Sequence, residues 1–97
     1  MDPLLAQLRG IRDRFILRLQ FQSAVFLSDK ILAFPAHTDE DVLVLAKCLY
    51  RLREYQRAAF MITSRDLHHT NMACCLLVVK CHVSVLAKLR LQICFLY

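Results

Sequence analysis

The stretch "REYQRAA" (residues 53–59) decides the fold, because it has the pattern of a turn followed by the second helix of a small helical hairpin. The chain uses almost the same pattern thirty-four residues earlier, in "LQFQSAV" (residues 19–25). The two stretches share an aromatic-Gln-x-Ala pattern, whose matched pairs are Phe21 and Tyr55, Gln22 and Gln56, and Ala24 and Ala58. The sequence therefore repeats one unit of 34 residues.

Length and composition limit the chain to one helical domain. With 97 residues there is room for a single small domain, residues 1–97, which buries only about two-thirds of its unfolded surface. The composition is 58% hydrophobic with one glycine and two prolines. It is too apolar for disorder and too poor in turn-forming residues for a sheet of many short strands. We therefore predict an all-α fold with short connections.

Helix start and stop signals divide this domain into three parts. Asp2-Pro3 suits a helix start, Pro35 ends a helix, and the acidic turn after Thr38 starts another. The predicted helices are about Pro3–Leu17, Phe21–Ala33, one from Thr38 or Asp39 to a turn at Arg53-Glu54, Tyr55–Thr63, and one from near Asn71. These helices predict a first hairpin over residues 3–36, a second over residues 38–66 and an incomplete third repeat over residues 70–97.

Three local features complete this prediction. The stretch "SRDLHHTN" (residues 64–71) is polar and is predicted to be a loop. The stretch "VSVLAKLRLQICFLY" (residues 83–97) lacks a clean helical period, and we predict it as helix. Gly10 lies inside the first helix, where it costs about 1 kcal/mol relative to alanine, and we expect it to allow a neighbour to approach closely.

Helical hairpins that repeat every 34 residues are the signature of tetratricopeptide repeats, which stack into α-solenoid arrays. Their consensus places large residues on helix A and small residues where helix B crosses it. The residues predicted to form this packing signature are Ala24, Leu45, Ala46, Leu49, Ala58 and Ile62. Ala46 and Ala58 suit a crossing in which two helix axes approach to about 8–10 Å, because a long side chain there would push them apart.

The first copy fits the consensus less well than the second. Arg12 stands where a small helix-A residue is expected, and Ser28 replaces a large residue of helix B. A helical bundle with accidental spacing therefore remains the alternative fold.

Residues that the general consensus does not dictate point to one family. The stretches "FQSAVFLSDKIL" (21–32), "LAKCLYRLREYQRAA" (45–59), "SRDL" (64–67) and "KCH" (80–82) resemble the N-terminal repeats of the tetratricopeptide scaffold subunits of the anaphase-promoting complex, in particular the family of its sixth subunit. The resemblance covers about Leu8 to His82 and fails after Val83.

The resemblance implies a non-catalytic scaffold for protein-protein interaction in the nucleus and cytoplasm. Members build a superhelical array that assembles a multisubunit ubiquitin ligase controlling mitotic exit, so the implied partners are other subunits of that complex. Their N-terminal repeats mediate self-association, which implies a homodimer. The apolar composition suggests the same, because so short a chain leaves apolar surface exposed. We expect the first helix to mediate the contact through Leu4, Leu8 and Phe15.

The net charge of +5 supports an alternative function, a basic helical nucleic-acid-binding module. The basic residues are scattered, although Arg14 and Arg18 share a helix face, so a solvated surface is the simpler explanation and nucleic acid is an unlikely partner. The start "MDPLLAQLRG" lacks the pattern of a secretory signal, which predicts a reducing, intracellular environment. Basic residues interrupt the apolar stretch from Met72 to Tyr97, so we predict no membrane span.

Candidate chemical sites are weak. The residues that suggest zinc are Cys74, Cys75, Cys81, His82, His68 and His69. They lack the usual Cys-x2-4-Cys spacing, and buried thiols packed between helices are the simpler interpretation. Cys81 or Cys48 could pair with a histidine as a nucleophile, but no third, orienting group is identifiable. With one glycine there is no phosphate-binding loop. We predict no enzyme activity, cofactor, metal or small-molecule substrate.

Overall fold

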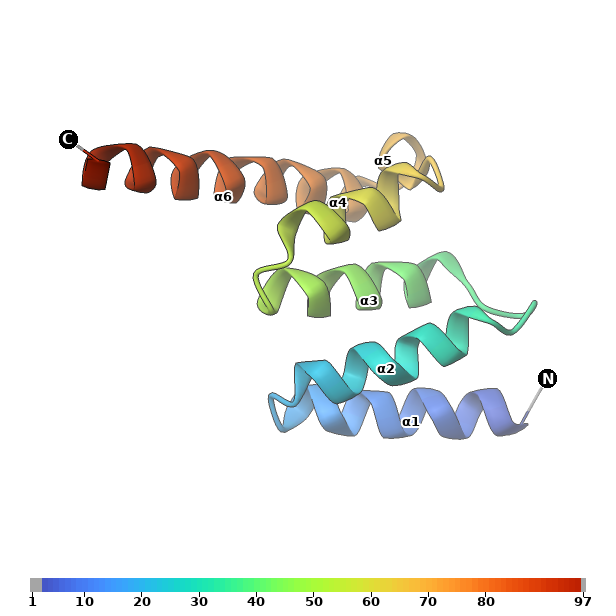
Figure 1. Ribbon diagram of the computed structural model, residues 1–97. Coiled ribbons are helices and arrows are strands. Elements are labelled where there is room, and N and C mark those ends of the chain that lie inside the picture. Colours follow the sequence, from blue (N-terminus) through green and yellow to red (C-terminus); the bar gives the residue numbers. More distant parts are fainter. Residues whose placement is uncertain (1–2, 97) are drawn as a thin grey trace.

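A computed structural model describes the backbone of residues 3–96 and the side chains of residues 3–90. Its helices are α1 (Pro3–Leu17), α2 (Phe21–Leu32), α3 (Asp39–Arg51), α4 (Tyr55–Thr63), α5 (Leu67–Thr70) and α6 (Met72–Leu96). Within residues 3–96 there is no strand. Consecutive helices pack side by side as a stack of antiparallel hairpins, α1 with α2 and α3 with α4 (Figure 1). The all-α prediction is confirmed.

The two hairpin turns have the same backbone geometry. Leu19 and Arg53, 34 residues apart, both adopt the left-handed conformation, with φ of 59° and 64°. In the first turn the Gln20 amide donates to the Phe15 carbonyl at 2.9 Å, and in the second the Glu54 amide donates to the Leu49 carbonyl at 2.9 Å. These bonds cap the last carbonyls of α1 and α3 in the Schellman arrangement. The 34-residue period is therefore repeated in the backbone as well as in the sequence.

The predicted loop at residues 64–71 is partly wrong, because it contains the single helical turn α5. Leu67 is buried there and anchors the turn to the core, whereas its polar neighbours gave the sequence a loop-like composition. Asn71 then starts α6, since its side-chain oxygen accepts from the Ala73 amide at 2.9 Å. The α2 helix ends at Leu32, one residue before the predicted end.

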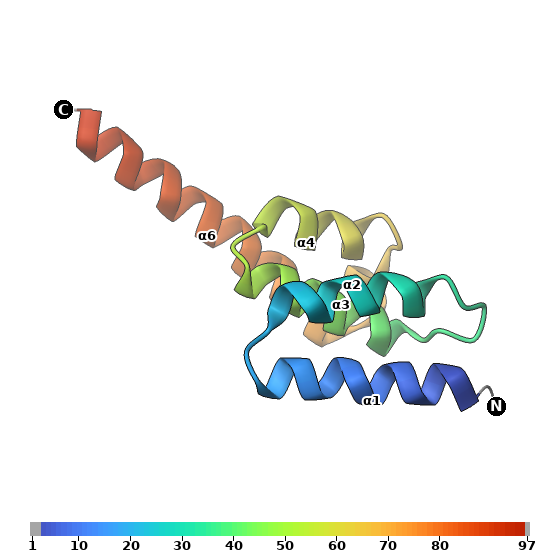
Figure 2. The same cartoon turned by 60° about the horizontal axis from the view of Figure 1, so that its bottom comes forward.

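The last helix gives the molecule its elongated shape. α6 is helical throughout residues 72–96, including the strand-like alternation around residues 88–91. Its first half packs against α3, α4 and α5, and its second half runs past the α3–α4 turn and away from the stack (Figure 2). The radius of gyration is 15.0 Å, whereas a compact domain of this length has roughly 12.5 Å.

The core lies where the packing signature predicts it. All six signature residues are buried. Ala24, Ala46 and Ala58 are fully inaccessible, as residues at a close helix crossing would be. Leu49 and Ile62 are also inaccessible and fill the space beside them.

The departure at Arg12 has a structural explanation. The Arg12 side chain is buried and extends to α3, where its Nη1 donates to Asp41 Oδ1 at 2.9 Å. Arg9 donates to the same carboxylate through Nε at 3.1 Å and Nη2 at 2.7 Å. Asp41 also accepts from the Thr38 amide at 2.9 Å, which closes the capping box of α3. A charged cluster therefore joins α1 to α3.

Within the described residues no neighbouring helix approaches Gly10 closely, contrary to our expectation. A Cβ atom at this position would meet nothing within 4 Å outside the helix. Because the position faces open space, the glycine costs helix stability without any visible packing benefit.

Candidate protein-interaction surfaces

The two outer helices of the stack expose apolar side chains. Repeat arrays normally end in units with a polar outer surface, because each repeat buries its faces only against its neighbours. In this chain α1 forms one end and α6 the other (Figure 1). Both present apolar rows, which makes the ends of the stack the candidate functional surfaces.

The first of these surfaces, called here the α1 face, consists of Leu4, Leu8, Ile11 and Phe15. These residues are spaced at helical intervals and share one side of α1. Leu4 is 53% exposed and Ile11 39% exposed, whereas Leu8 and Phe15 are half-buried. The predicted self-association residues thus lie together, and Ile11 is an addition that its helical spacing already indicated.

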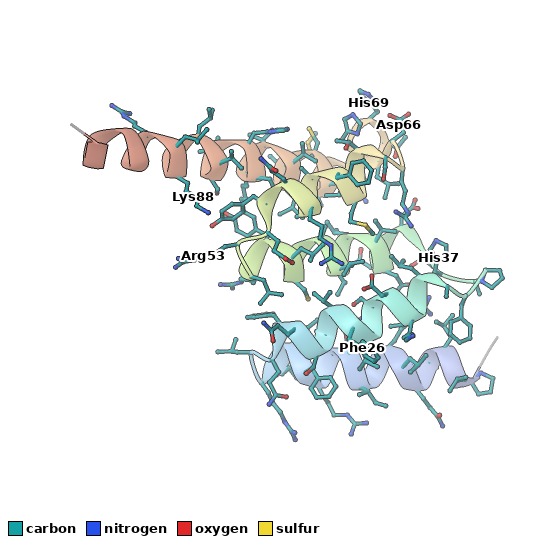
Figure 3. All side chains as sticks on the ribbon, viewed as in Figure 1. Phe26, His37, Arg53, Asp66, His69 and Lys88 are labelled. Atoms are coloured by element: carbon teal, nitrogen blue, oxygen red, sulfur yellow. The ribbon has the colours of Figure 1, made fainter. Side chains whose placement is uncertain are left out.

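A cleft continues the α1 face onto α2. It has a volume of about 450 Å³ and is lined by Phe15, Gln22, Ser23, Phe26 and Leu27. Phe26 stands out from α2 and is 63% exposed (Figure 3). The cleft therefore offers an apolar opening next to the α1 face.

The second surface, called here the α6 face, is an exposed apolar row on α6. Its members are Met72, Leu76, Val79, Val83 and Leu86, each more than half exposed. The opposite side of the same helix is in the core through Cys74, Leu77, Val78 and Cys81. α6 thus has one buried and one uncovered apolar side over residues 72–86.

A groove between α3 and α6 adjoins the α6 face. It has a volume of about 390 Å³. Its charged lining residues are Lys47, Arg51 and Lys80, and Leu76 and Leu77 contribute apolar surface. We call it the basic groove. Sequence reasoning missed it because its lysines and arginine come from two helices whose contact the sequence did not specify.

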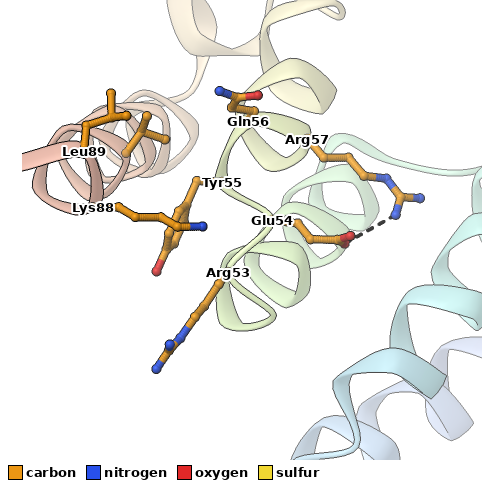
Figure 4. A pocket seen from close by; sticks show the side chains of 8 residues that line it. Arg53, Glu54, Tyr55, Gln56, Arg57, Lys88 and Leu89 are labelled. Carbon is orange, nitrogen blue, oxygen red and sulfur yellow. Dashed lines mark hydrogen bonds and ion pairs between the residues drawn. The ribbon is translucent and has the colours of Figure 1, made fainter. Parts of the chain in front are cut away.

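A further cleft lies in the corner where α6 leaves the stack. It has a volume of about 480 Å³, and Tyr55, Arg53 and Lys88 are among its lining residues. Lys88 lies beside the Tyr55 ring, and Arg53 extends from the turn that joins α3 to α4 (Figure 4). Glu54 also lines it and pairs with Arg57 at 3.4 Å. The corner therefore carries charges of both signs.

The basic residues do not form one continuous surface for a polyanion. Arg9 and Arg12 are bound to Asp41, and Arg57 lies near Glu54 and Asp29. Arg14 and Arg18 are exposed in and just after α1, which forms the opposite end of the stack from α6. The nucleic-acid alternative is not supported.

The cysteines and histidines that suggested zinc do not form one ligand group among the described residues. Cys74 and Cys81 are buried two helical turns apart, and His82 is exposed. Among the described residues one other group has metal-ligand chemistry: Asp66, His68 and His69, whose ligand atoms lie within 4.8 Å of one another (Figure 3). His69 Nε2 is 3.5 Å from Asp66 Oδ1, an exposed pair on the α5 turn. The sequence pointed to the histidines and missed Asp66.

The candidate nucleophiles lie in unfavourable surroundings. Burial raises the pKa of the Cys48 and Cys81 thiols, and it does the same for Cys74. A raised pKa disfavours the thiolate, which is the reactive form of cysteine. These thiols therefore act as small apolar side chains of the core.

One helix meets the length and composition criteria for crossing a membrane. The segment Met72–Arg90 has a mean hydropathy of 1.8, and 22% of it is buried within the fold. This finding weakens our argument that basic residues interrupt the stretch. Length and composition alone do not assign a span, because core helices of water-soluble proteins share both properties. The absence of a membrane partner therefore stays a prediction.

Comparison with known families assigns the chain. The family described as "Anaphase-promoting complex, cyclosome, subunit 3" matches residues 18–90. The chain belongs to this family. The match includes α2 to α5 and most of α6, whereas α1 and the entire α1 face lie outside it. Membership in this anaphase-promoting complex family confirms the resemblance that the short sequence stretches indicated and, together with the helical stack, the tetratricopeptide-repeat fold.

Two curated relatives agree with this assignment. The chain is 37% identical over 82 residues to the Cell division cycle protein 16 homolog of Mus musculus, a match that covers 84% of this chain and 13% of the relative. It is 36% identical over 78 residues to the protein of the same name in Homo sapiens, which covers 80% of this chain and 13% of the relative. The chain therefore spans about 13% of the length of these relatives.

Proposed function

We propose that this chain is a non-catalytic scaffold unit of an anaphase-promoting complex ubiquitin ligase, where it acts in cell-cycle control by binding other subunits. The observation that carries the proposal is the helical stack with two uncovered apolar ends, in a chain that belongs to a family of this complex. Each end offers a surface for another helix, and the described residues form no cleft with a constellation of catalytic groups. The action of the chain is therefore association, for which neither a cofactor nor a small-molecule substrate is needed.

We further propose that two copies associate through the α1 face. An apolar row that spans α1 in the monomer loses its contact with water when it packs against an equivalent surface. In a two-fold arrangement α1 of one protomer lies along the α1–α2 cleft of its partner, and the reverse contact buries the same residues. Phe15 borders both the face and the cleft, so it is central to the contact. The homodimer is expected to work in the nucleus and cytoplasm.

The experiment that tests the scaffold role is co-purification from dividing mammalian cells that express the tagged chain. The proposal predicts recovery of anaphase-promoting complex subunits, identified by mass spectrometry. Leu4→Asp with Ile11→Asp places two charges on exposed positions of the α1 face, and recovery of a differently tagged second copy of this chain should fall strongly. Phe60→Asp, an exposed apolar position on α4, is the matched control and should change nothing.

Two results would overturn the proposal. Absence of ligase subunits from the purified material would contradict the scaffold role. Unchanged recovery of the second copy with the doubly substituted chain would contradict self-association through the α1 face, whatever happens to the other subunits.

A further inference from the structure

The α6 face lies next to the basic groove, so apolar and basic residues occur side by side there. Self-association through the α1 face does not involve either surface. Along α6 the row from Met72 to Leu86 advances in alternating steps of four and three residues. This is the spacing of a coiled-coil seam, in which the side chains of a second helix fit between those of the first. The row covers about four helical turns, or roughly 21 Å. It is long enough to hold another helix.

The charges that line the basic groove beside this row are positive, whereas two acids of α3, Asp39 and Glu40, lie near Cys74 at the N-terminal end of α6. α6 contains no Asp or Glu in its entire sequence. Lys80 borders the α6 face and also lines the basic groove, where Lys47 and Arg51 come from α3. None of these three cations forms an ion pair with a described residue. An apolar row next to three cations without anionic partners favours a ligand that brings both apolar side chains and carboxylates.

A second copy of this chain does not supply that combination. Its uncovered apolar rows lie on α1 and α6. α6 is basic, and the single acid of α1, Asp13, already pairs with Arg12. The acidic first turn of α3 is attached to a helix whose apolar residues are already buried. A second copy would therefore bring apolar residues but no row of carboxylates to the α6 face, which disfavours it there.

A lipid bilayer fits the geometry less well than a helix does. To span a membrane, α6 would have to separate from α3 and α4, because Cys74, Leu77 and Cys81 on its other side are in the core. Lys80 near the middle of the span would also oppose insertion, because a charged side chain at the centre of a bilayer is costly. A flat lipid surface could contact the exposed row, but it would leave the basic groove unfilled.

We infer that the α6 face and the basic groove bind an amphipathic helix of another protein, whose apolar stripe is bordered on one side by Asp and Glu residues. The apolar stripe packs between Leu76, Val79 and Val83. The carboxylates reach Lys80 on α6 and Lys47 and Arg51 across the groove. This inference extends the proposed scaffold role, since it names a second kind of partner and a separate surface for it.

Direct binding measurements test the inference with two synthetic helices about 20 residues long. Both carry leucine at two positions of each heptad; one has glutamate at the bordering positions and the other has lysine. Fluorescence anisotropy of the labelled peptides with the full chain should show at least about tenfold tighter binding of the glutamate peptide. The preference should shrink as salt concentration rises, because charges near the surface are screened.

Two variants locate the binding surface. Val79→Asp with Val83→Asp should weaken the glutamate peptide at least about tenfold, because it places like charge on the apolar row. Lys47→Glu with Lys80→Glu should reverse the preference and favour the lysine peptide. Phe60→Asp is the matched exposed control and should bind as the unchanged chain does. All substituted residues of the two test variants are exposed, and circular dichroism should show unchanged helicity.

The outcomes separate this inference from the proposed function. Equal affinity for the two peptides, or no loss in the Val79 and Val83 variant, would overturn it. Binding to phosphatidylserine vesicles that depends on the same residues, without binding of the glutamate peptide, would assign the surface to lipid and also overturn it. Sedimentation of these variants without peptide should still show the dimer, whereas Leu4→Asp with Ile11→Asp should abolish the dimer and keep peptide binding.

Discussion

The two complete hairpins share one backbone plan but differ in how they are buried. Their turns at Leu19 and Arg53 are equivalent, and Ala24 and Ala58 are both inaccessible. Ile11, however, is 39% exposed, whereas its counterpart Leu45 is 1% exposed. The second hairpin is covered on both sides by neighbouring helices, and the first is covered on one side only. The comparison shows that the repeat determines the backbone geometry of a hairpin. The position of the hairpin in the stack determines which of its side chains are buried.

The equivalent positions 12 and 46 show the difference most clearly. In the second hairpin Ala46 permits close contact between helices, as the consensus requires. In the first, Arg12 occupies the same position and is held by Asp41 at the start of the second hairpin. Burial opposes ionisation of Asp41, but hydrogen bonds from Arg9, the Thr38 amide and Arg12 outweigh it and hold the pKa of its carboxyl well below the usual range. An ionic contact thus replaces an apolar one.

The largest effect is expected at the apolar crossing of the second hairpin. Ala58→Arg would overpack a site with no free space and bury an unpaired charge, so we expect about 4–5 kcal/mol of destabilisation, measured by urea unfolding. Gln56→Arg, on an exposed position two residues away, should cost less than about 0.5 kcal/mol. Ala59 is a poorer control than its sequence position suggests, because it is buried too. Equal effects at positions 56 and 58 would mean that the crossing is misplaced.

The ionic contact of the first hairpin should be somewhat less costly to break. Asp41→Ala leaves the Arg12 guanidinium buried beside one exposed carboxylate, Asp13, and we expect about 3 kcal/mol of destabilisation. Arg14→Ala, which removes an exposed arginine of the same helix, should cost less than about 0.5 kcal/mol.

The same contact predicts a dependence on pH. Because the folded state lowers the pKa of Asp41, its contribution to stability is complete above the unfolded pKa of about 3.9 and declines as pH falls toward the folded pKa. The difference in unfolding free energy between the unchanged chain and Asp41→Asn should therefore be larger at pH 7 than at pH 3. A difference that does not change with pH would contradict an ionised, hydrogen-bonded Asp41.

A smaller effect is expected at Ser28, the counterpart of Ile62. Ser28 is buried, and its hydroxyl has no hydrogen-bond partner among the described residues. Ser28→Ala removes this unsatisfied group and should stabilise the chain by about 1 kcal/mol. Ser23→Ala, on an exposed position of the same helix, controls for helix propensity and should give the smaller gain of the two. A loss of stability in Ser28→Ala would show that the hydroxyl is satisfied.

The smallest effect concerns the exposed side of α1. Gly10→Ala should stabilise the chain by about 0.8–1 kcal/mol, since the added Cβ meets nothing within 4 Å and alanine is the better helix former. Ala6→Gly, on an exposed position one turn earlier, should destabilise by a similar amount. A loss of stability in Gly10→Ala would show that a neighbour approaches this site after all, as a partner protomer would.

Most of the helical stack could be predicted from the sequence because its signals are local. The proline at position 3 and the small residues at crossings act within one hairpin, and the 34-residue period repeats the same local pattern in the next hairpin. The contact of Arg12 with Asp41 could not, because the two residues lie 29 positions apart and a helix cap already explained Asp41. The apolar row of α1 was predicted in part, through Leu4, Leu8 and Phe15, whereas the row of α6 was not, since the sequence alone does not show whether an apolar residue faces the core or solvent. Which sides of α1 and α6 are exposed depends on where the neighbouring helices lie, and the sequence does not specify those positions.

The measurement that tests the account most directly is sedimentation equilibrium of the chain at micromolar concentration, at low and at physiological salt. The account predicts a discrete dimer at both salt concentrations, because burial of apolar surface is not screened by ions. It also predicts that Leu4→Asp with Ile11→Asp gives a monomer of unchanged helicity, whereas Phe60→Asp remains a dimer. A monomer for the unchanged chain, or a dimer that survives both charges on the α1 face, would contradict it.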